Sequence, residues 1–531
     1  MSSTSAASGL RDRELDWRFL LPVPRGGPLT TLRVVSHDPT TIERARELSV
    51  ADVVVAAGPD TVDGVVVLTG RPEDVVAALA GVRPGGVFYG EVEPDGARSA
   101  RWTPGRLIRA LRRAGAGRPA VYWRRRRHGA DVLYIPLDVP GALPWYLREA
   151  LDDRGLRRRV VRQLVLPLVP RDASRLQPLA RRYSVAGQVT DASADRGRGG
   201  TPALLHDATG SELRPVVLAR GSGCWSRVVL LPFGALDRTP RGVVKTPRRR
   251  THNEATASEQ ETLTRLSDVL APSLAATLPS PTGLRYWSEL AVGTERFLPG
   301  RPLAFAGDQV PGWPAPAARL EGAVRWLVDF GLATRQARVA ADSPEAARLV
   351  DEPVRRCVER LGLLPGSTID GLVRPHAIAL AGSRTLPLVW THCDLTPRNM
   401  RWNGQQHAVV DWEAARVGPP LGDLCYLLLH WSWPGLPSFD ADPAQAFGGS
   451  LGAGSALPAR VSAHHVARYC AALEIDLMLV EPLVLAMLAQ QALDRADRVQ
   501  ACGVDPTTDD NRYAALVSLV LRGSPVLGSL R

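Results

Sequence analysis

The segment Thr391-His-Cys-Asp-Leu-Thr-Pro-Arg-Asn399 decides how the C-terminal half of this chain is interpreted. An apolar run, 386–390, precedes the segment, and a second apolar run after it leads to Asp411. Asp394 and Asn399 have the spacing Asp-x-x-x-x-Asn, and Asp411 adds a second carboxylate where a predicted strand ends. Phosphoryl transfer needs a carboxylate near the acceptor hydroxyl and oxygen ligands for magnesium. The pattern therefore predicts a phosphoryl-transfer site.

One lysine stands out further upstream. The chain has 65 lysine and arginine residues, and Lys245 is the only lysine among them. It ends a short apolar run, and its compact ammonium suits nucleotide phosphates better than a planar guanidinium does. Before it, residues 216–230 read as two strands joined by a tight turn that holds Gly221 and Gly223. Glycines let a backbone approach phosphate oxygens, so we predict that these three residues bind the nucleotide.

Together these motifs resemble the aminoglycoside phosphotransferase and choline kinase family. That family's signature runs His-Gly-Asp-(Leu/Phe)-x-x-x-Asn, then Ile-Asp-(Trp/Phe)-Glu, then Gly-Pro-Pro-x-x-Asp-Leu. The matching segments here are 392–399, Val410-Asp-Trp-Glu413 and Gly418-Pro-Pro-Leu-Gly-Asp-Leu424. Cys393 departs from the family by standing where glycine is common, and we expect this small residue to fit. The resemblance covers residues 216–493.

The resemblance implies a role for each residue of the site. Asp394 would be the catalytic base or the carboxylate that orients the acceptor. His392 would brace the catalytic loop, and Asp423 would secure that loop from the following helix. Asn399 and Asp411 would bind Mg²⁺.

The resemblance also implies how the nucleotide is held. The family pattern Glu-x-Glu-x-Leu places the partner of Lys245 at Glu259, with Glu261 as the close alternative. Residues 295–303 resemble the family's segment that joins the two lobes, where backbone groups hold the adenine. Backbone contacts leave no side-chain code, so the expected cofactors are Mg²⁺ and ATP, with GTP left open.

Hydrophobic periodicity predicts the wider organisation. From residue 32 onward, short apolar runs alternate with helical stretches, which is typical of βαβ units. We predict an α/β, Rossmann-like domain over 1–190, a β-rich nucleotide-binding lobe over 191–303, and a helical catalytic and substrate-binding lobe over 304–531. The last two together would form an α+β, bilobal phosphotransferase domain of the protein-kinase type.

Two segments of the N-terminal domain resemble an S-adenosylmethionine-dependent methyltransferase. Residues 34–46 look like its second strand and helix, and residues 79–92 look like a late strand beyond the cofactor pocket. No Gly-x-Gly loop follows a first strand, because residues 20–27 lack the form that would cradle the cofactor. We expect a degenerate, non-catalytic domain, with a working methyltransferase as the alternative.

Charge, apolar content and cysteine content indicate which partners and which cellular compartment to expect. The net charge of +11 comes with arginine runs in three separate regions that lack interleaved aromatic residues, so no nucleic-acid partner is expected. The most apolar stretch, 477–493, contains Glu481 and Pro482 and falls short of a membrane span. The six scattered cysteines suggest free thiols. These features predict a cytoplasmic protein.

Two functions remain at this stage. The first is a small-molecule kinase that moves the γ-phosphate of a nucleotide to a hydroxyl of a sugar, an aminoglycoside-like compound or an amino alcohol. The second is a pseudokinase that binds nucleotide and acts by interaction. Filled catalytic positions favour the enzyme. The acceptor would lie against residues within 304–352 and 440–510, which carry no fixed pattern.

Overall fold

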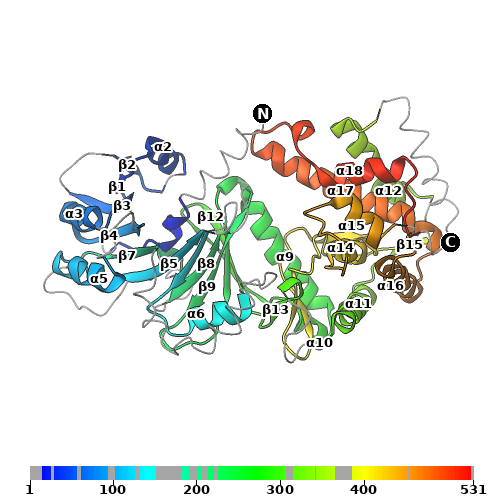
Figure 1. The fold of residues 1–531 in the computed structure, drawn as a ribbon, viewed down its shortest axis with the longest axis horizontal. Helices are drawn as coiled ribbons and strands as arrows, with labels where there is room; N and C mark the ends of the chain where they lie inside the picture. Colours follow the sequence, from blue (N-terminus) through cyan, green and yellow to red (C-terminus); the bar gives the residue numbers. More distant parts are fainter. Residues whose placement is uncertain are drawn as a thin grey trace. The chain divides into compact units, whose positions relative to one another are not determined.

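The chain forms two compact units. Residue contacts group Met1–Ala257 with Pro281–Phe297, and Ser258–Ser280 with Leu298–Arg531. These divisions differ from the sequence-based borders at 190/191 and 303/304, so the three-domain division stays a prediction. The computed structural model (Figure 1) describes residues 15–24, 29–48, 50–56, 61–93, 102–126, 132–150, 182–190, 201–205, 213–219, 225–305, 315–340, 342–364, 385–452 and 454–527.

One twelve-stranded sheet organises the first unit. Its strand order is β11-β12-β10-β9-β8-β6-β5-β7-β4-β3-β1-β2. Figure 1 shows its strands and the helices beside them. The strands are β1 (Thr31–Val35), β2 (Val53–Val55), β3 (Val62–Gly70), β4 (Val82–Val92), β5 (Ala120–Arg126), β6 (Val132–Pro136), β7 (Tyr183–Gln188), β8 (Arg214–Ala219), β9 (Arg227–Phe233), β10 (Val243–Pro247), β11 (Pro281–Trp287) and β12 (Leu290–Glu295).

The first four strands are parallel, and the central strand β3 is buried on both faces. β1 pairs in parallel with β2 and β3, and β3 pairs in parallel with β4. Val65 and Val67 belong to one core cluster and Val66 to another, because alternate side chains of a strand point to opposite faces. A parallel sheet with two buried faces is typical of α/β proteins. The helices α2 (Pro39–Glu47), α3 (Pro72–Ala78), α5 (Pro104–Arg113) and α6 (Ala142–Trp145) also belong to this unit.

The sheet continues without a break past residue 190. β7 is antiparallel to both β4 and β5, and β6 is antiparallel to both β5 and β8. The α/β part and the predicted nucleotide-binding strands therefore share one sheet. Whether residues 1–190 are Rossmann-like in the family sense stays a prediction.

A buried ion pair ties the start of the chain to this sheet. Asp16 and Arg248 form two parallel hydrogen bonds of 2.9 Å, and both side chains are fully buried. Arg18 also donates a hydrogen bond to the backbone carbonyl of Arg248. A paired, doubly hydrogen-bonded arrangement is what makes two charges tolerable inside a protein.

The second unit is mainly helical. Helix α9 (Asn253–Val269) begins in the first unit and runs into the second. The other helices are α10 (Pro272–Ala275), α11 (Pro316–Ala333), α12 (Pro344–Leu361), α14 (Gly422–His430), α15 (Pro443–Ser450), α16 (Leu457–Leu473), α17 (Val480–Ala501) and α18 (Arg512–Leu521). The short strands are β13 (Arg301–Pro302), β14 (Arg338–Ala340), β15 (Thr385–Pro387), β16 (Val389–Thr391), β17 (Met400–Trp402), β18 (His407–Val409) and β19 (Arg416–Gly418).

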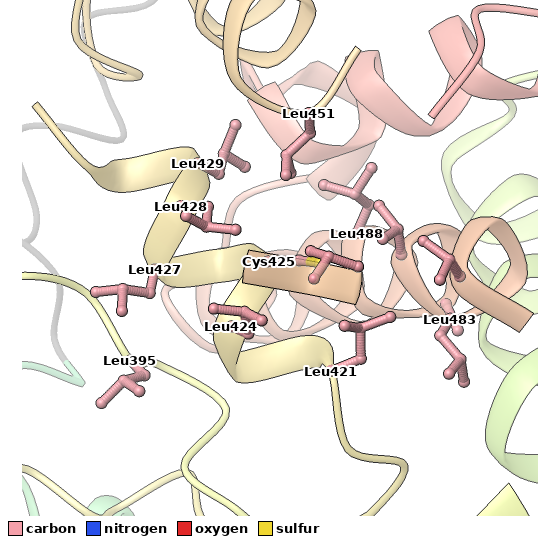
Figure 2. Close-up of a cluster of buried hydrophobic side chains, with 14 of the residues drawn as sticks. Leu395, Leu421, Leu424, Cys425, Leu427, Leu428, Leu429, Leu451, Leu483 and Leu488 are labelled. Carbon is pink, nitrogen blue, oxygen red and sulfur yellow. The ribbon is translucent and has the colours of Figure 1, made fainter. Parts of the chain in front are cut away.

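Helix α14 lies inside the core of this unit. Figure 2 shows Leu424, Cys425 and Leu428 of α14 in one buried cluster with Leu483 and Leu488 of α17. A helix with apolar residues on every side is expected to be buried all round. This position holds the first turn of α14 rigidly beside the catalytic loop.

The stretch predicted to be too short for a membrane span is a core helix. Leu477–Ala501 is long and apolar enough to cross a membrane, but 61% of its apolar window is buried inside the structure. Pro482 does not interrupt it, because α17 begins at Val480 and proline is tolerated in a first helical turn. The length and apolar composition of this helix are therefore explained by its packing in the core of the second unit.

The cysteine prediction was correct for part of the chain. Cys357, Cys393, Cys425 and Cys470 are free thiols. Cys502 is disulfide-bonded, so the expectation of free thiols was wrong there. A disulfide depends on how close two sulfur atoms lie in space, which scattered sequence positions do not reveal.

Candidate active site

The catalytic loop follows β16 and is held by Asp423. One carboxylate oxygen of Asp423 accepts a hydrogen bond from the backbone N–H of His392 (2.6 Å), and the other accepts one from Cys393 (2.8 Å). Asp423 lies in the first turn of α14, whose buried position fixes it. The structure thus gives Asp423 the contacts expected of a residue that secures the loop.

His392 braces the loop from inside. Its side chain is buried, and Nε2 lies 3.0 Å from the carbonyl oxygen of Val410. The backbone N–H of Asp394 donates to Nδ1 at 3.3 Å. Because Nδ1 accepts this hydrogen bond, Nε2 is the ring nitrogen that donates a hydrogen bond to the carbonyl of Val410. His392 therefore connects the catalytic loop to the strand end that carries Asp411.

Asn399 is oriented by Asp394. Its side-chain N–H group donates to the backbone carbonyl of Asp394 (2.9 Å) and to the carboxylate of the same residue (3.3 Å). Since the amide nitrogen is directed to Asp394, the amide oxygen is the atom that can serve a metal. The sequence spacing of these two residues thus corresponds to direct contact.

Asp411 lies next to Asn399 along the backbone hydrogen bonds. The N–H of Val410 donates to the carbonyl of Asn399 at 2.9 Å, directly before Asp411. Asp411 itself has a φ of +75°, in a sparsely populated region that residues with a side chain adopt infrequently. Strained residues that persist in a folded protein concentrate at functional sites.

The donor set fits magnesium. Mg²⁺ binds one or two protein oxygen groups and completes its coordination with water and phosphate oxygens. The amide oxygen of Asn399 and the carboxylate of Asp411 are donors of this kind. In the part of the chain that the structure describes, no group of three His, Cys, Asp or Glu residues forms a metal site. A metal held here would therefore rely on nucleotide phosphates for its other ligands.

The surroundings of Asp394 make its carboxyl group a stronger base. The pKa of Asp394 is raised to about 6, mainly by burial and in addition by the negative charge of Asp411. His392 and Arg498 oppose this shift. A general base is most effective when its pKa approaches the working pH, so the environment suits proton acceptance.

Glu259 and Glu261 occupy opposite environments on α9. Glu259 is buried, and its carboxylate accepts a hydrogen bond from the backbone N–H of Trp412 at 2.8 Å. Glu261 is exposed and pairs with Arg265 at 2.5 Å on the same helix. Of the two alternatives, Glu259 is the one that touches the Asp411 segment. The pairing of Glu259 with Lys245 stays a prediction.

Lys245 forms an ion pair that the sequence did not suggest. Its ammonium lies 3.0 Å from the carboxylate of Glu295, and both side chains are buried. Lys245 pairs with Gly293 in the antiparallel ladder of β10 and β12, so Glu295 is its diagonal neighbour. The register between β10 and β12 decides this contact, and the sequences around Lys245 and Glu295 do not reveal that register. The predicted phosphate-binding Gly221 and Gly223 lie outside the described residues.

Cys393 is the other feature that sequence reasoning missed. Its φ is +62°, the left-handed region that favours glycine. The resemblance placed glycine at this position, and that preference was the available signal. The family's preference for glycine at this position is therefore explained by the backbone conformation, whereas our expectation for Cys393 considered only the size of its side chain.

Comparisons with known proteins agree with the C-terminal motifs. Residues 227–463 match the model of the phosphotransferase enzyme family, abbreviated APH. The predicted resemblance of the C-terminal part to this family is confirmed, and with it the prediction of a phosphotransferase fold for that part is supported. The methyltransferase resemblance of the N-terminal part finds no support. No curated protein matches the chain significantly.

Solved structures of low identity also match. An aminoglycoside phosphotransferase, APH(3'')-Id from Streptomyces rimosus, is 15% identical over 53% of this chain and 96% of that chain, with a TM-score of 0.31. A glucosamine kinase is 16% identical over 60% of this chain and 81% of its own, with a TM-score of 0.31. A macrolide 2'-phosphotransferase from Brachybacterium faecium is 19% identical over 58% and 97%, with a TM-score of 0.32.

Proposed function

We propose that the C-terminal part of this chain is an ATP- and Mg²⁺-dependent phosphotransferase that phosphorylates a hydroxyl group of a small molecule. One observation carries the proposal: the half-buried carboxylate of Asp394 is hydrogen-bonded to Asn399, and Asn399 is joined through the backbone to the Asp411 segment. This set supplies a base beside two magnesium donors. The family match over residues 227–463 supports the same reaction class.

The residues suggest a simple division of labour. Asp394 accepts the proton of the acceptor hydroxyl while the hydroxyl oxygen forms a bond to the γ-phosphorus of ATP. The bond between the γ-phosphorus and the oxygen that bridges to the β-phosphate breaks, which releases ADP. Asn399 and Asp411 would hold a magnesium ion, which would neutralise charge on the phosphate oxygens. Lys245, kept in place by Glu295, supplies a positive charge for the nucleotide phosphates.

Location and partners belong to the same proposal. ATP as the phosphate donor fits a cytoplasmic protein, and the expected partner is a small-molecule acceptor rather than a nucleic acid or a membrane. The acceptor class, whether a sugar, an aminoglycoside-like compound or an amino alcohol, is decided by the test below. GTP is the alternative donor.

A coupled assay tests the proposal. Purified full-length protein is incubated with Mg²⁺, ATP or GTP and a panel of hydroxyl compounds, and phosphorylated product is measured directly. We expect transfer to at least one acceptor and a loss of about 100-fold or more in Asp394→Asn. Transfer that survives in Asp394→Asn would contradict the assignment of the base. Nucleotide binding without transfer to any acceptor would favour the pseudokinase instead.

A further inference from the structure

A cavity of about 300 Å³ lies behind the catalytic loop, within the second unit. Its walls come from α12, from the residues around β16 and β19, from the start of α14 and from α17. Most of the wall is apolar, with Pro353, Leu483 and Met487 as examples. Ligand pockets are typically apolar cavities of about this size or larger with a few polar groups. The cavity therefore has the general form of a small-molecule site.

This cavity is separate from the reacting groups. Asp394, Asn399 and Asp411 do not belong to its lining, whereas Cys393 and Asp423 do. Both of these residues hold the catalytic loop and take no part in the proposed chemistry. An occupant would thus touch the supports of the loop, and it would lie against residues of α12 and α17 rather than against Asp394, Asn399 or Asp411.

The charges of the lining favour an anion. Arg348 and Arg416 are its two cationic side chains, and Asp423 is its one carboxylate among the described residues. Both oxygens of Asp423 are engaged by backbone N–H groups. Arg416 lies 3.7 Å from Asp494, and Arg348 is exposed, with no ion pair or hydrogen bond to the residues that the structure describes. The guanidinium fork of arginine binds carboxylate and phosphate groups well.

The cavity is also connected to the backbone of the loop. The side-chain N–H of Gln491, which lines the cavity, donates to the carbonyl of Cys393. The thiol of Cys393 lies 3.1 Å from the hydroxyl of Thr391, another lining residue. Since Cys393 immediately precedes Asp394, a ligand in contact with Gln491 and Cys393 would bear on the position of the catalytic carboxylate.

We propose that this cavity is a regulatory site for a small organic anion, with a carboxylate or phosphate group held by Arg348 and Arg416 and a compact apolar body of about ten non-hydrogen atoms between α12 and α17. The binding part of the proposal stands independently. The regulatory part rests on the proposed function, because it predicts a change in the rate of phosphoryl transfer.

Binding is tested first, without any need for activity. Benzoate, hexanoate and phenyl phosphate serve as probes, and neutral benzamide serves as the matched control. We expect at least one anion to bind saturably by isothermal titration calorimetry and to raise the melting temperature, and benzamide to do neither. Binding by none of the three anions at concentrations up to about 10 mM would overturn the proposal.

Variants locate the binding. Arg348→Met should weaken anion binding about tenfold or more, and Ala486→Trp, which fills the cavity, should abolish it. Arg356→Met is the control, because Arg356 is exposed on the same helix and does not line the cavity. An unchanged affinity in both Arg348→Met and Ala486→Trp, or displacement of the anion by ADP, would place the ligand elsewhere and refute the site.

Regulation is tested last, on the acceptor identified above. A saturating anion should change kcat of the wild type and of Arg356→Met by about twofold or more, and leave kcat of Ala486→Trp unchanged. Anion binding with no effect on kcat would refute regulation while leaving the site intact. If the protein transfers no phosphate at all, the proposed function fails, and the calorimetric result still decides whether the site exists.

Discussion

Asp394 combines a functional advantage with a cost in stability. Burial raises the pKa of this carboxyl to about 6 in the folded protein, well above its ordinary value of 3.8. The folded state therefore binds this proton more tightly than the unfolded state does, and the stabilising effect is lost as the pH rises through about 6. Above that pH the protein carries a half-buried negative charge at Asp394.

This cost gives the first prediction. Asp394→Asn should raise the free energy of unfolding at pH 8 by up to about 3 kcal/mol, because the amide has the same shape without the charge. The gain should shrink as the pH falls from 6 to 4, where Asp394 becomes protonated. Urea unfolding at several pH values measures it. A gain that does not depend on pH would show that charge is not the cause.

The same group determines the pH dependence of the reaction. In the wild type, kcat/KM should increase as the pH rises through about 6, because only the ionised carboxylate accepts the hydroxyl proton. Initial rates at saturating Mg²⁺ and ATP between pH 5 and 8 measure the profile. A flat profile across this range would mean that Asp394 orients the acceptor but does not take its proton.

Cys393 allows a test of backbone strain. Its φ of +62° is unfavourable for a residue with a side chain. Cys393→Gly should leave stability within about 1 kcal/mol of the wild type, since lost strain and lost side-chain contacts offset each other. Cys393→Val should lower it by about 2 kcal/mol or more, because a β-branched residue fits this conformation poorly. Equal stability of the two variants would contradict strain as the reason.

At the scale of elements, helix α9 contacts the segment that carries Asp411 through the carboxylate of Glu259. Glu259→Ala removes the acceptor of the Trp412 N–H group and should lower the free energy of unfolding by about 1–3 kcal/mol, since a buried donor loses its partner. Glu261→Ala is the matched control, two positions along the same helix, and should change stability by less than about 0.5 kcal/mol. A larger loss in Glu261→Ala than in Glu259→Ala would reverse our interpretation of the helix.

Local motifs were predictable because their contacts are local. The Asp394–Asn399 contact spans five positions, so sequence spacing was a sufficient guide. The contact of Asp423 with His392 spans 31 positions, and it was expected only from the family resemblance. The Lys245–Glu295 pair was not predictable, because a contact across two strands depends on their register. The core position of helix α17 was not predictable for a similar reason: only packing shows that an apolar stretch is a core helix.

At the scale of the whole molecule, the ion pair of Asp16 and Arg248 links the first described segment of the chain to the residue that follows β10. Asp16→Ala leaves the buried guanidinium of Arg248 without this carboxylate and should cost about 3–5 kcal/mol of unfolding free energy. Asp52→Ala, at an exposed position of the same unit, should cost less than about 0.5 kcal/mol. Chemical denaturation of both variants measures the difference, and similar values for the two would show that the pair does not fasten the segment.

Because the sheet is continuous, we expect the C-terminal part to need the strands of the N-terminal part in order to fold. A fragment that begins at residue 201 would expose the edge of β8, where Val217 and Leu218 otherwise pair with β6. Exposed apolar edges promote association between chains, so we expect this fragment to aggregate or to lack a cooperative melt. Co-expression with residues 1–190 should restore a soluble complex, because the missing strands return as a separate chain. Gel filtration and thermal melting measure both outcomes. A monomeric, cooperatively folded 201–531 fragment would show that the C-terminal part is independent, and that the shared sheet adds no stability to it.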